Sequence, residues 1–303
     1  MTITGRASIF LLFLLLPLIS LQRTARSIAP DGPSMAQAGA PAEDDKDLLE
    51  IGRAPNPIVP ATPESEIKIV SYNIRWRGGE DLRRLIDLLR GDKEIGGAAI
   101  IGLQEVDRNR KRTGNINTAR TMAEALGMYY AWAAPPQVKE GEEEETGVVI
   151  LSPYPMEDVV RIVLPHKGPG GRRRAAIGAT LRIGRTPVRF YSVHAETRIA
   201  SEKKMEQLRA VIEDFSRRPG VERAVMLGDF NTIKDKDVNA CVKLFTEAGF
   251  STPFPHDRPT WKTFIIRLKL DWIWLRNLQT TASGITRSIG LSDHWPLWVK
   301  AKL

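Results

Sequence analysis

The sequence predicts a layered α/β domain over residues 67–303. Short, nearly continuous apolar runs alternate there with segments whose apolar residues recur at helical spacing. Continuous apolar runs are typical of strands that are covered on both faces of a sheet. No internal repeat is visible, and about sixty N-terminal residues lack the composition of a folded unit, so we expect a single domain.

The elements follow one another along the chain. Three apolar stripes predict helices at residues 82–89, 119–126 and 205–215, and Gly127 is expected to end the second. The predicted strands are residues 67–72, 98–103, 148–151, 175–183, 188–193, 224–227, 270–275 and 297–301.

The N-terminal segment, residues 1–27, predicts a signal peptide or a membrane anchor. Arg6 precedes an apolar run over residues 9–21, and this run is shorter than the roughly 20 residues that a spanning helix needs. We therefore expect a secretory signal that is cleaved after Ser27, with an uncleaved anchor as the alternative. Either outcome predicts an extracytoplasmic protein, periplasmic or secreted, and the anchor would also attach it to the membrane.

Residues 28–66 are predicted to form a flexible tether. Pro, Ala and acidic residues dominate this segment, and prolines at such density block both helical and sheet hydrogen bonds. One short helical turn is expected at residues 47–51.

The predicted domain is more basic than the whole chain. Five of the 44 basic and eight of the 36 acidic residues precede residue 67, which leaves 39 against 28, a net charge of +11 compared with +8 overall. Such a charge favours a polyanionic partner, either nucleic acid, anionic lipid or a phosphorylated small molecule. Charge alone is equally consistent with a basic surface that only keeps the protein soluble. The single cysteine, Cys241, excludes an internal disulfide.

Polar groups that bind metals or move protons lie at the ends of the apolar runs, following most of these runs and preceding the last one. These residues are Asn73, Glu105, His194, Asp229, Asn231, Asp293 and His294. Since ligands bind at strand ends in α/β sheets, these side chains are expected to converge on one cleft. Taken singly, each has a simpler explanation as a turn residue, a helix cap or a core histidine.

Asp271 differs because it lies inside an apolar run, residues 270–275. A carboxylate there carries a large desolvation cost unless it is paired, and a histidine is the natural partner.

The polar motifs, taken in order, resemble those of the endonuclease/exonuclease/phosphatase superfamily of DNase-like hydrolases. They are Ser71-Tyr72-Asn73, Leu103-Gln104-Glu105-Val106, Val193-His194, Gly228-Asp229-Phe230-Asn231, Leu270-Asp271-Trp272-Ile273 and Ser292-Asp293-His294. The resemblance covers about residues 67–303. It implies a four-layer α/β sandwich, in which two β-sheets pack face to face between helices. It also implies a phosphodiesterase or phosphatase that uses one divalent cation, normally Mg²⁺, with Mn²⁺ as a substitute.

The resemblance implies a metal site and a water-orienting pair. Glu105 looks like the carboxylate that holds the cation, Asn73 lies beside it, and Asp293 is a further acid near the metal. Oxygen ligands of this kind suit Mg²⁺. Asp229 and Asn231 resemble the pair that orients the attacking water and a phosphoryl oxygen.

Two histidines have counterparts in the family. His294 resembles the histidine that pairs with an acid, here Asp271, and His194 resembles a second histidine on the other side of the phosphate. In the DNase-like branch a glutamate supports the second histidine, and Glu145 is the candidate. Arg172 and Arg174 lie where the family often has an arginine near the phosphate.

The motifs exclude some branches of the family but do not identify the substrate. Arg75 and Val106-Asp107-Arg108 disfavour the AP endonucleases, and Lys269-Leu270-Asp271-Trp272 disfavours the inositol-phosphate 5-phosphatases. Both histidines are retained, as in DNases, sphingomyelinase-type enzymes, bacterial phosphodiesterases and the hydrolase domain of glycosylphosphatidylinositol-anchor remodelling proteins. The alternatives are therefore a monomeric nuclease, an enzyme that cleaves phospholipid or glycosylphosphatidylinositol headgroups, and a non-catalytic surface binding module.

Overall fold

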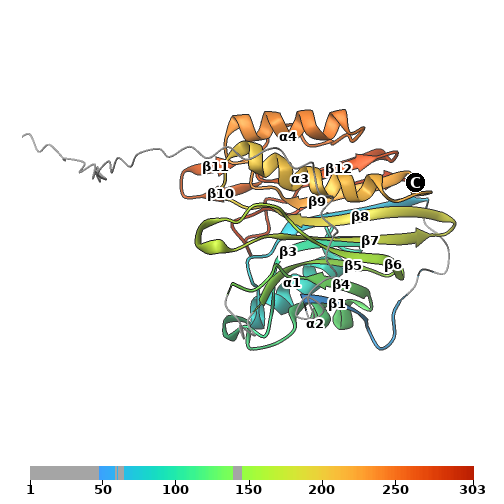
Figure 1. Cartoon of the computed structure of the whole chain (residues 1–303). Coiled ribbons are helices and arrows are strands. Elements are labelled where there is room, and N and C mark those ends of the chain that lie inside the picture. Colours follow the sequence, from blue (N-terminus) through green and yellow to red (C-terminus); the bar gives the residue numbers. More distant parts are fainter. Residues whose placement is uncertain (1–47, 59, 61–64, 139–144) are drawn as a thin grey trace, which may run out of the picture. The chain divides into compact units, whose positions relative to one another are not determined.

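Two β-sheets stack between two pairs of helices in the computed structural model, which describes residues 48–58, 60, 65–138 and 145–303 (Figure 1). In spatial order the first sheet contains β1 (Leu49–Arg53), β4 (Tyr129–Ala133), β5 (Glu145–Ser152), β3 (Ile100–Arg108), β2 (Glu66–Asn73), β14 (Leu297–Lys302) and β13 (Gln279–Ile285). The second contains β12 (Asp271–Arg276), β9 (Arg223–Asp229), β8 (Thr186–His194), β7 (Ala175–Ile183) and β6 (Met156–Val163). β10 (Trp261–Thr263) and β11 (Ile266–Leu268) form a hairpin that belongs to neither of these sheets.

Three apolar layers hold the sandwich together. The helices α1 (Gly79–Gly91) and α2 (Thr118–Leu126) cover the outer face of the first sheet. The helices α3 (Ser201–Ser216) and α4 (Asp235–Glu247) cover that of the second. A third apolar layer fills the space between the sheets. The predicted four-layer α/β sandwich is confirmed.

The double coverage explains why the strands read as continuous apolar runs. In β2, Ile67 and Ile69 lie in the layer between the sheets, whereas Val70 and Tyr72 pack under α1 and α2. Alternate side chains of a strand point to opposite faces, so both faces must be apolar where both are covered. Every strand and helix predicted above is present, although most begin or end a few residues away from the predicted bounds.

The predicted tether and its helical turn are wrong where the structure describes them. Residues Leu49–Arg53 form β1, an edge strand that pairs antiparallel with β4. Glu50 fixes this strand, because its carboxylate accepts hydrogen bonds from Arg108, Arg120 and Tyr130. The fold therefore begins inside the segment that proline content assigned to a tether. The predicted signal or anchor, and most of the tether, lie outside the described residues.

The elements that were not predicted are mostly weakly apolar. They are β1, β4, β6, β10, β11, β13 and α4. Exposed and half-buried residues alternate along β13, for example, so its sequence carries no continuous apolar run. Within the described ranges, no helix is long and apolar enough to cross a membrane.

Candidate active site

The register of the second sheet brings three of the predicted residues together at one edge. β8 and β9 run parallel, with His194 directly opposite Asp229, while β12 runs antiparallel to β9, with Asp271 opposite Asp229. All three side chains are buried. His194, Asp229 and Asp271, which lie at strand ends, are thus side by side on three neighbouring strands.

The first sheet contributes Asn73 and Glu105 from the ends of β2 and β3. The ladder between β3 and β5 is interrupted between Gln104 and Val106, and Glu105 there has a left-handed backbone with φ of 57°. Such a bulge redirects the side chain of the extra residue. Asn73 Nδ2 lies 3.3 Å from Glu105 Oε1 and 3.0 Å from Asp229 Oδ2. The asparagine therefore links the two sheets and joins their carboxylates in one site.

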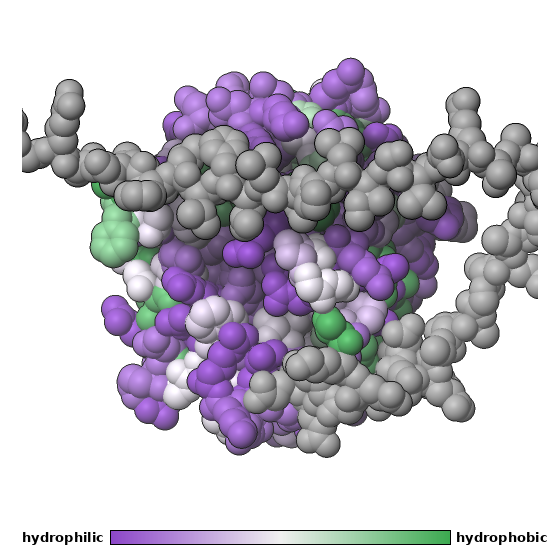
Figure 2. All heavy atoms as spheres, turned by 60° about the vertical axis from the view of Figure 1, so that its left-hand side comes forward, coloured by the Kyte–Doolittle hydropathy of each residue, from purple (hydrophilic) through white to green (hydrophobic). Residues whose placement is uncertain are grey.

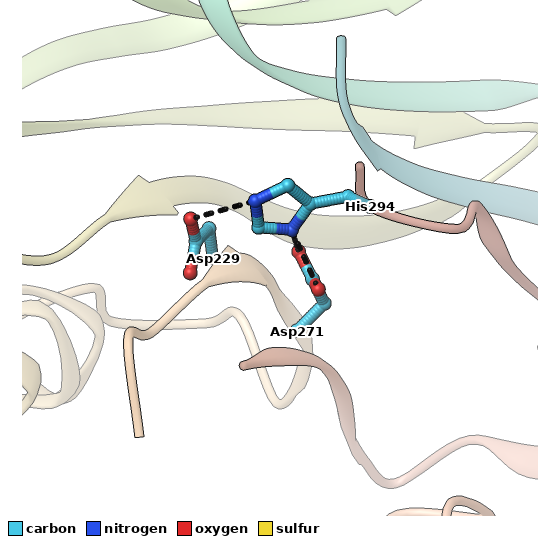
Figure 3. Close-up of side chains that lie close together, drawn as sticks. All are labelled: Asp229, Asp271 and His294. Atoms are coloured by element: carbon cyan, nitrogen blue, oxygen red, sulfur yellow. Dashed lines mark hydrogen bonds and ion pairs between the residues drawn. The ribbon is translucent and has the colours of Figure 1, made fainter. Parts of the chain in front are cut away.

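His294 forms the predicted pair with Asp271 (Figure 3). Its Nδ1 lies 2.9 Å from Asp271 Oδ2, and its Nε2 lies 3.7 Å from Asp229 Oδ2. Burial by itself lowers the pKa of His294, but the negative charges of Asp271 and Asp229 outweigh burial and raise that pKa to about 9. The ring is therefore cationic at neutral pH and directs an N–H at each carboxylate.

Thr260 completes this pair and was not foreseen from the sequence. Its hydroxyl donates to Asp271 Oδ2 over 2.7 Å and accepts from the backbone N–H groups of Leu270 and Asp271. These contacts fix the carboxylate that holds the imidazole. No motif marks Thr260, because its role depends on contact with a strand ten residues further along the chain.

His194 lies on the other side of Asp229 in the opposite charge state. Its Nε2 lies 3.6 Å from Asp229 Oδ2, and its Nδ1 lies 3.4 Å from Arg174 Nη1. Burial, reinforced by the positive charge of Arg174, holds the pKa of His194 well below its ordinary value. Because an arginine can only donate, Nδ1 is the acceptor and the single proton is on Nε2. A neutral and a cationic histidine thus face the same carboxylate oxygen.

The predicted partner of His194 is wrong. Glu145 Oε2 accepts from Arg108 Nε over 2.5 Å, and no contact joins Glu145 to His194 among the described residues. Glu145 and Arg108 lie directly opposite each other on β5 and β3, so the ladder itself brings this ion pair together. Arg174 instead lies between His194 and the buried Glu196, to which its Nε donates over 3.2 Å. In the sequence, the only indication of the contact between Arg174 and Glu196 is that Glu196 follows His194 by two residues.

Asp229 is the centre of the arrangement, and Asn231 positions it. The backbone N–H of Asn231 donates to Asp229 Oδ1 over 3.0 Å, and Asn231 Nδ2 donates to the carbonyl of Ala195 over 3.0 Å. Burial raises the pKa of Asp229 above its ordinary value despite the positive charge of His294 nearby. This carboxylate is thereby suited to accept a proton near neutral pH.

Asp293 lies at the margin of the cluster. Its carboxylate is 3.1 Å from Arg75 Nη1, and the backbone N–H of Arg75 donates to Asn73 Oδ1 over 3.1 Å. No contact in the described part of the chain joins Asp293 to Glu105. The Asp293 carboxylate is thus engaged by an arginine, and a metal role for Asp293 stays a prediction.

A basic cleft of about 520 Å³ opens beside Glu105. Arg172 and Arg174 line it, as do Arg110, Arg112 and the half-buried side of Trp76. Glu145 also lines it, although its carboxylate is engaged by Arg108. Arg112 is paired with Asp107 and Arg174 with Glu196, but the four guanidinium groups still outnumber the two carboxylates that line the cleft. Such a lining suits an anionic substrate.

Two positions in this cluster have the donor groups for a divalent cation. Glu105 forms no ion pair among the described residues and lies on the cleft near Arg172, so its oxygens fit a hard cation such as Mg²⁺. Asp229, Asp271 and His294 also offer ligand atoms that lie within 4.8 Å of one another. In that trio, however, the hydrogen bond to Asp271 already occupies Nδ1 of His294, so the ring has only Nε2 left to offer. The chemistry of the donors therefore favours Glu105.

A buried ion pair supports the loop that carries Asn231. Lys204 Nζ donates to the carbonyl of Asn231 and lies 3.2 Å from Asp237 Oδ2, and both charged groups are almost completely buried. Ser201 donates to the same aspartate. The pair ties α3 and α4 to the site loop.

Lys204→Met is expected to lower the free energy of unfolding by about 3–5 kcal/mol, because it leaves the buried Asp237 without a counter-charge. Urea unfolding followed by circular dichroism measures the change. Lys236→Met is the matched control, since Lys236 is exposed and its ion pair with Glu202 spans 3.9 Å; it should cost less than about 1 kcal/mol. Equal effects of the two substitutions would contradict a supporting role for the buried pair.

Two stacked sheets with carboxylate, amide and imidazole groups at their strand ends define the class of metal-dependent phosphoric ester hydrolases. Within this class, the chain belongs to the endonuclease/exonuclease/phosphatase family, whose family model matches residues 70–294. The chain is accordingly an enzyme that cleaves phosphoric esters.

Solved structures share the fold at low sequence identity. An endonuclease/exonuclease/phosphatase from Beutenbergia cavernae DSM 12333 is 18% identical with a TM-score of 0.64, covering 79% of this chain and 72% of that chain. D. rerio TDP2 in complex with a single-strand DNA product is 18% identical with a TM-score of 0.59, covering 79% and 100%. ANGEL2, a 2',3'-cyclic phosphatase in complex with adenosine-2',3'-vanadate, is 14% identical with a TM-score of 0.60, covering 78% and 96%. No curated protein matched the sequence significantly.

Proposed function

We propose that this enzyme is a Mg²⁺-dependent phosphodiesterase in which Asp229 activates water between two histidines of opposite charge state. The observation that carries the proposal is the arrangement around Asp229 Oδ2. The neutral His194 and the cationic His294 direct their Nε2 atoms at it from 3.6 and 3.7 Å. A static structural role would not require two buried imidazoles at one carboxylate.

The groups suit an in-line attack of water on phosphorus. In this proposal the water oxygen forms the new P–O bond while its proton passes to Asp229. The ester P–O bond breaks, and the leaving oxygen takes a proton from His294 Nε2. Asp271 and Thr260 hold the imidazole in place for that transfer. The Nε2–H of His194 donates to a phosphoryl oxygen on the other side, where Arg174 adds positive charge.

Glu105 would hold the cation, with Asn73 beside it. A divalent cation at this position neutralises phosphoryl charge and so stabilises the transition state. The basic cleft next to Glu105 would bind the rest of an anionic substrate through Arg172 and its neighbours.

The substrate class proposed first is a phosphodiester. Family members with this fold include a protein crystallised with a single-strand DNA product and a 2',3'-cyclic phosphatase, so nucleotide esters are natural substrates to test. A phospholipid headgroup is the second candidate, since the domain carries a net charge of +11 and suits any polyanion.

The test is a panel of phosphate esters with Mg²⁺ present or removed by chelator. Bis-p-nitrophenyl phosphate, plasmid DNA, RNA, sphingomyelin and phosphatidylinositol cover the alternatives. We expect turnover of bis-p-nitrophenyl phosphate that chelator abolishes and Mg²⁺ restores, together with turnover of one natural ester. Binding of DNA or anionic lipid without turnover of any ester would contradict the proposal and favour a binding module.

A further inference from the structure

The β10–β11 hairpin ends in an exposed apolar tip whose residues have no role in the candidate active site. Its turn residues are Phe264 and Ile265, whose exposed fractions are 107% and 92%, and the adjoining Ile266 is 50% exposed. Two-residue hairpin turns favour Asn, Asp or Gly, and neither turn residue here has the positive φ that would require a special side chain. Backbone geometry therefore gives no reason for large apolar residues at this turn.

The hairpin is fixed at its base to the catalytic segment. Trp261 forms a β-bridge with His294, and backbone hydrogen bonds join Lys262 to Asp293 and Trp295 to Thr260 over 2.9 and 2.8 Å. Strands rise about 3.3 Å per residue, so the tip stands roughly 10 Å beyond the bridge to His294. In Figure 1 the hairpin lies at the left-hand edge of the molecule. That side comes forward in Figure 2, where hydrophilic side chains predominate and apolar ones form small groups.

The flanks of the apolar tip carry unneutralised positive charge. Lys262 and Arg267 are exposed and lie directly opposite each other across the two strands. Like charges in that position destabilise a hairpin. No ion pair engages either residue within the described ranges, and the ammonium of Lys262 lies over the ring of Trp295 at 5.3 Å. Arg287 lies over the same ring at 5.3 Å, while the exposed acid Asp257 lines a small cavity with Arg267.

We propose that this hairpin is an interfacial anchor that inserts Phe264 and Ile265 into an anionic lipid bilayer. Apolar residues flanked by cations bind the boundary between headgroups and acyl chains, where they are buried by about 5–10 Å. The anionic headgroups would neutralise Lys262 and Arg267, which removes the repulsion between them. Because the tip extends about 10 Å beyond Trp261, an inserted hairpin holds the mouth of the active site at the level of the headgroups.

Other occupants fit the hairpin less well. Stacking on nucleic-acid bases uses aromatic side chains and Arg planes. Phe264 and Arg267 offer such faces, but Ile265 and Ile266 do not. A stable interface with a second copy of the chain needs roughly 800 Å² per partner, which is far more than three residues at a hairpin tip provide. The combination of aliphatic tip and basic flanks therefore favours lipid.

The test places an environment-sensitive fluorophore on the full-length chain at Ile265→Cys. The native Cys241 is buried and will not react under mild labelling. Ile51→Cys, at an exposed position on β1, is the matched control. With vesicles of phosphatidylcholine and phosphatidylglycerol, the emission of the hairpin probe is expected to shift to the blue while the control probe does not. The readout is local, so attachment through residues 9–21 would not move it.

Two substitutions test the chemistry of the anchor. In the labelled chain, Phe264→Ser should raise the lipid concentration for the half-maximal shift by about 10-fold or more. Lys262→Gln with Arg267→Gln should do the same on anionic vesicles. The pair Arg83→Gln and Arg84→Gln on α1 removes the same charge from another exposed surface and should have little effect.

Several outcomes would overturn the anchor. These are an unchanged hairpin probe with vesicles, equal effects of the hairpin pair and the α1 pair, a shift induced by single-stranded DNA instead of lipid, or dimerisation abolished by Phe264→Ser. None of these measurements needs turnover. An active enzyme with an unmoved probe would therefore reject the anchor alone and leave the proposed function intact.

Discussion

Replacing His294 with alanine is expected to lower turnover by about 10²–10⁴-fold, the range for groups that act as general acids or bases. The structure gives the reason, because His294 is buried, cationic at neutral pH and directed at Asp229. Asp271→Asn should lose a similar factor, since it removes the charge that keeps the ring protonated and oriented. The measurement is kcat on the most active ester of the panel.

The double variant distinguishes a functional pair from two separate residues. Groups that act as one unit are non-additive, so Asp271→Asn with His294→Ala should be little worse than either single change. His256→Ala is the matched control, because His256 is exposed and lies outside the cluster, and it should retain full activity. Independent, multiplying losses would leave the enzyme assignment intact but reject the pairing as a catalytic unit.

Glu105→Gln is expected to lower turnover by about 10²-fold or more, because the cation at this carboxylate contributes charge stabilisation worth several kcal/mol. The same change should raise the Mg²⁺ concentration required for half-maximal activity. Isothermal titration of Mg²⁺ into the full chain provides a readout that is independent of turnover. Glu124→Gln, on the exposed face of α2, is the matched control and should change neither quantity.

Metal titration also decides between the two positions that have suitable donors. If the cation is bound at Glu105, His294→Ala lowers kcat but leaves Mg²⁺ affinity nearly unchanged. If the trio of Asp229, Asp271 and His294 holds it instead, His294→Ala weakens metal binding and Glu105→Gln does not. The latter result would contradict the assignment of the cation to Glu105.

Some features of the site were predictable because they follow from local properties of the chain. Asp271 lies in an apolar strand, and the desolvation cost of an unpaired carboxylate requires a partner for it wherever that partner comes from. The structure confirms that partner as His294. The clustering of His194 and Asp229 was also predictable, since both end strands of an α/β sheet.

Other features were misread because through-space contacts determine them. Glu145 has the right place in the sequence to support His194, but it lies opposite Arg108 in the β3–β5 ladder and pairs there. Leu49–Arg53 follows a proline- and acid-rich segment, yet it forms a strand because β4 offers an edge and Glu50 meets several donors from distant elements. The register between β3 and β5 and the free edge of β4 both depend on how distant segments pair, so a short stretch of sequence does not reveal them.

The layered fold, the order of the polar strand ends and the need for a partner at Asp271 all follow from the amino-acid sequence alone. Periodicity and desolvation are properties of a residue and its neighbours along the chain, so the order of amino acids is enough to reveal them. The opposite charge states of His194 and His294, in contrast, arise only in the folded protein. Burial lowers the pKa of both rings; Arg174 adds to this effect at His194, whereas the charges of Asp271 and Asp229 outweigh it at His294. These distances exist only after the two sheets have packed.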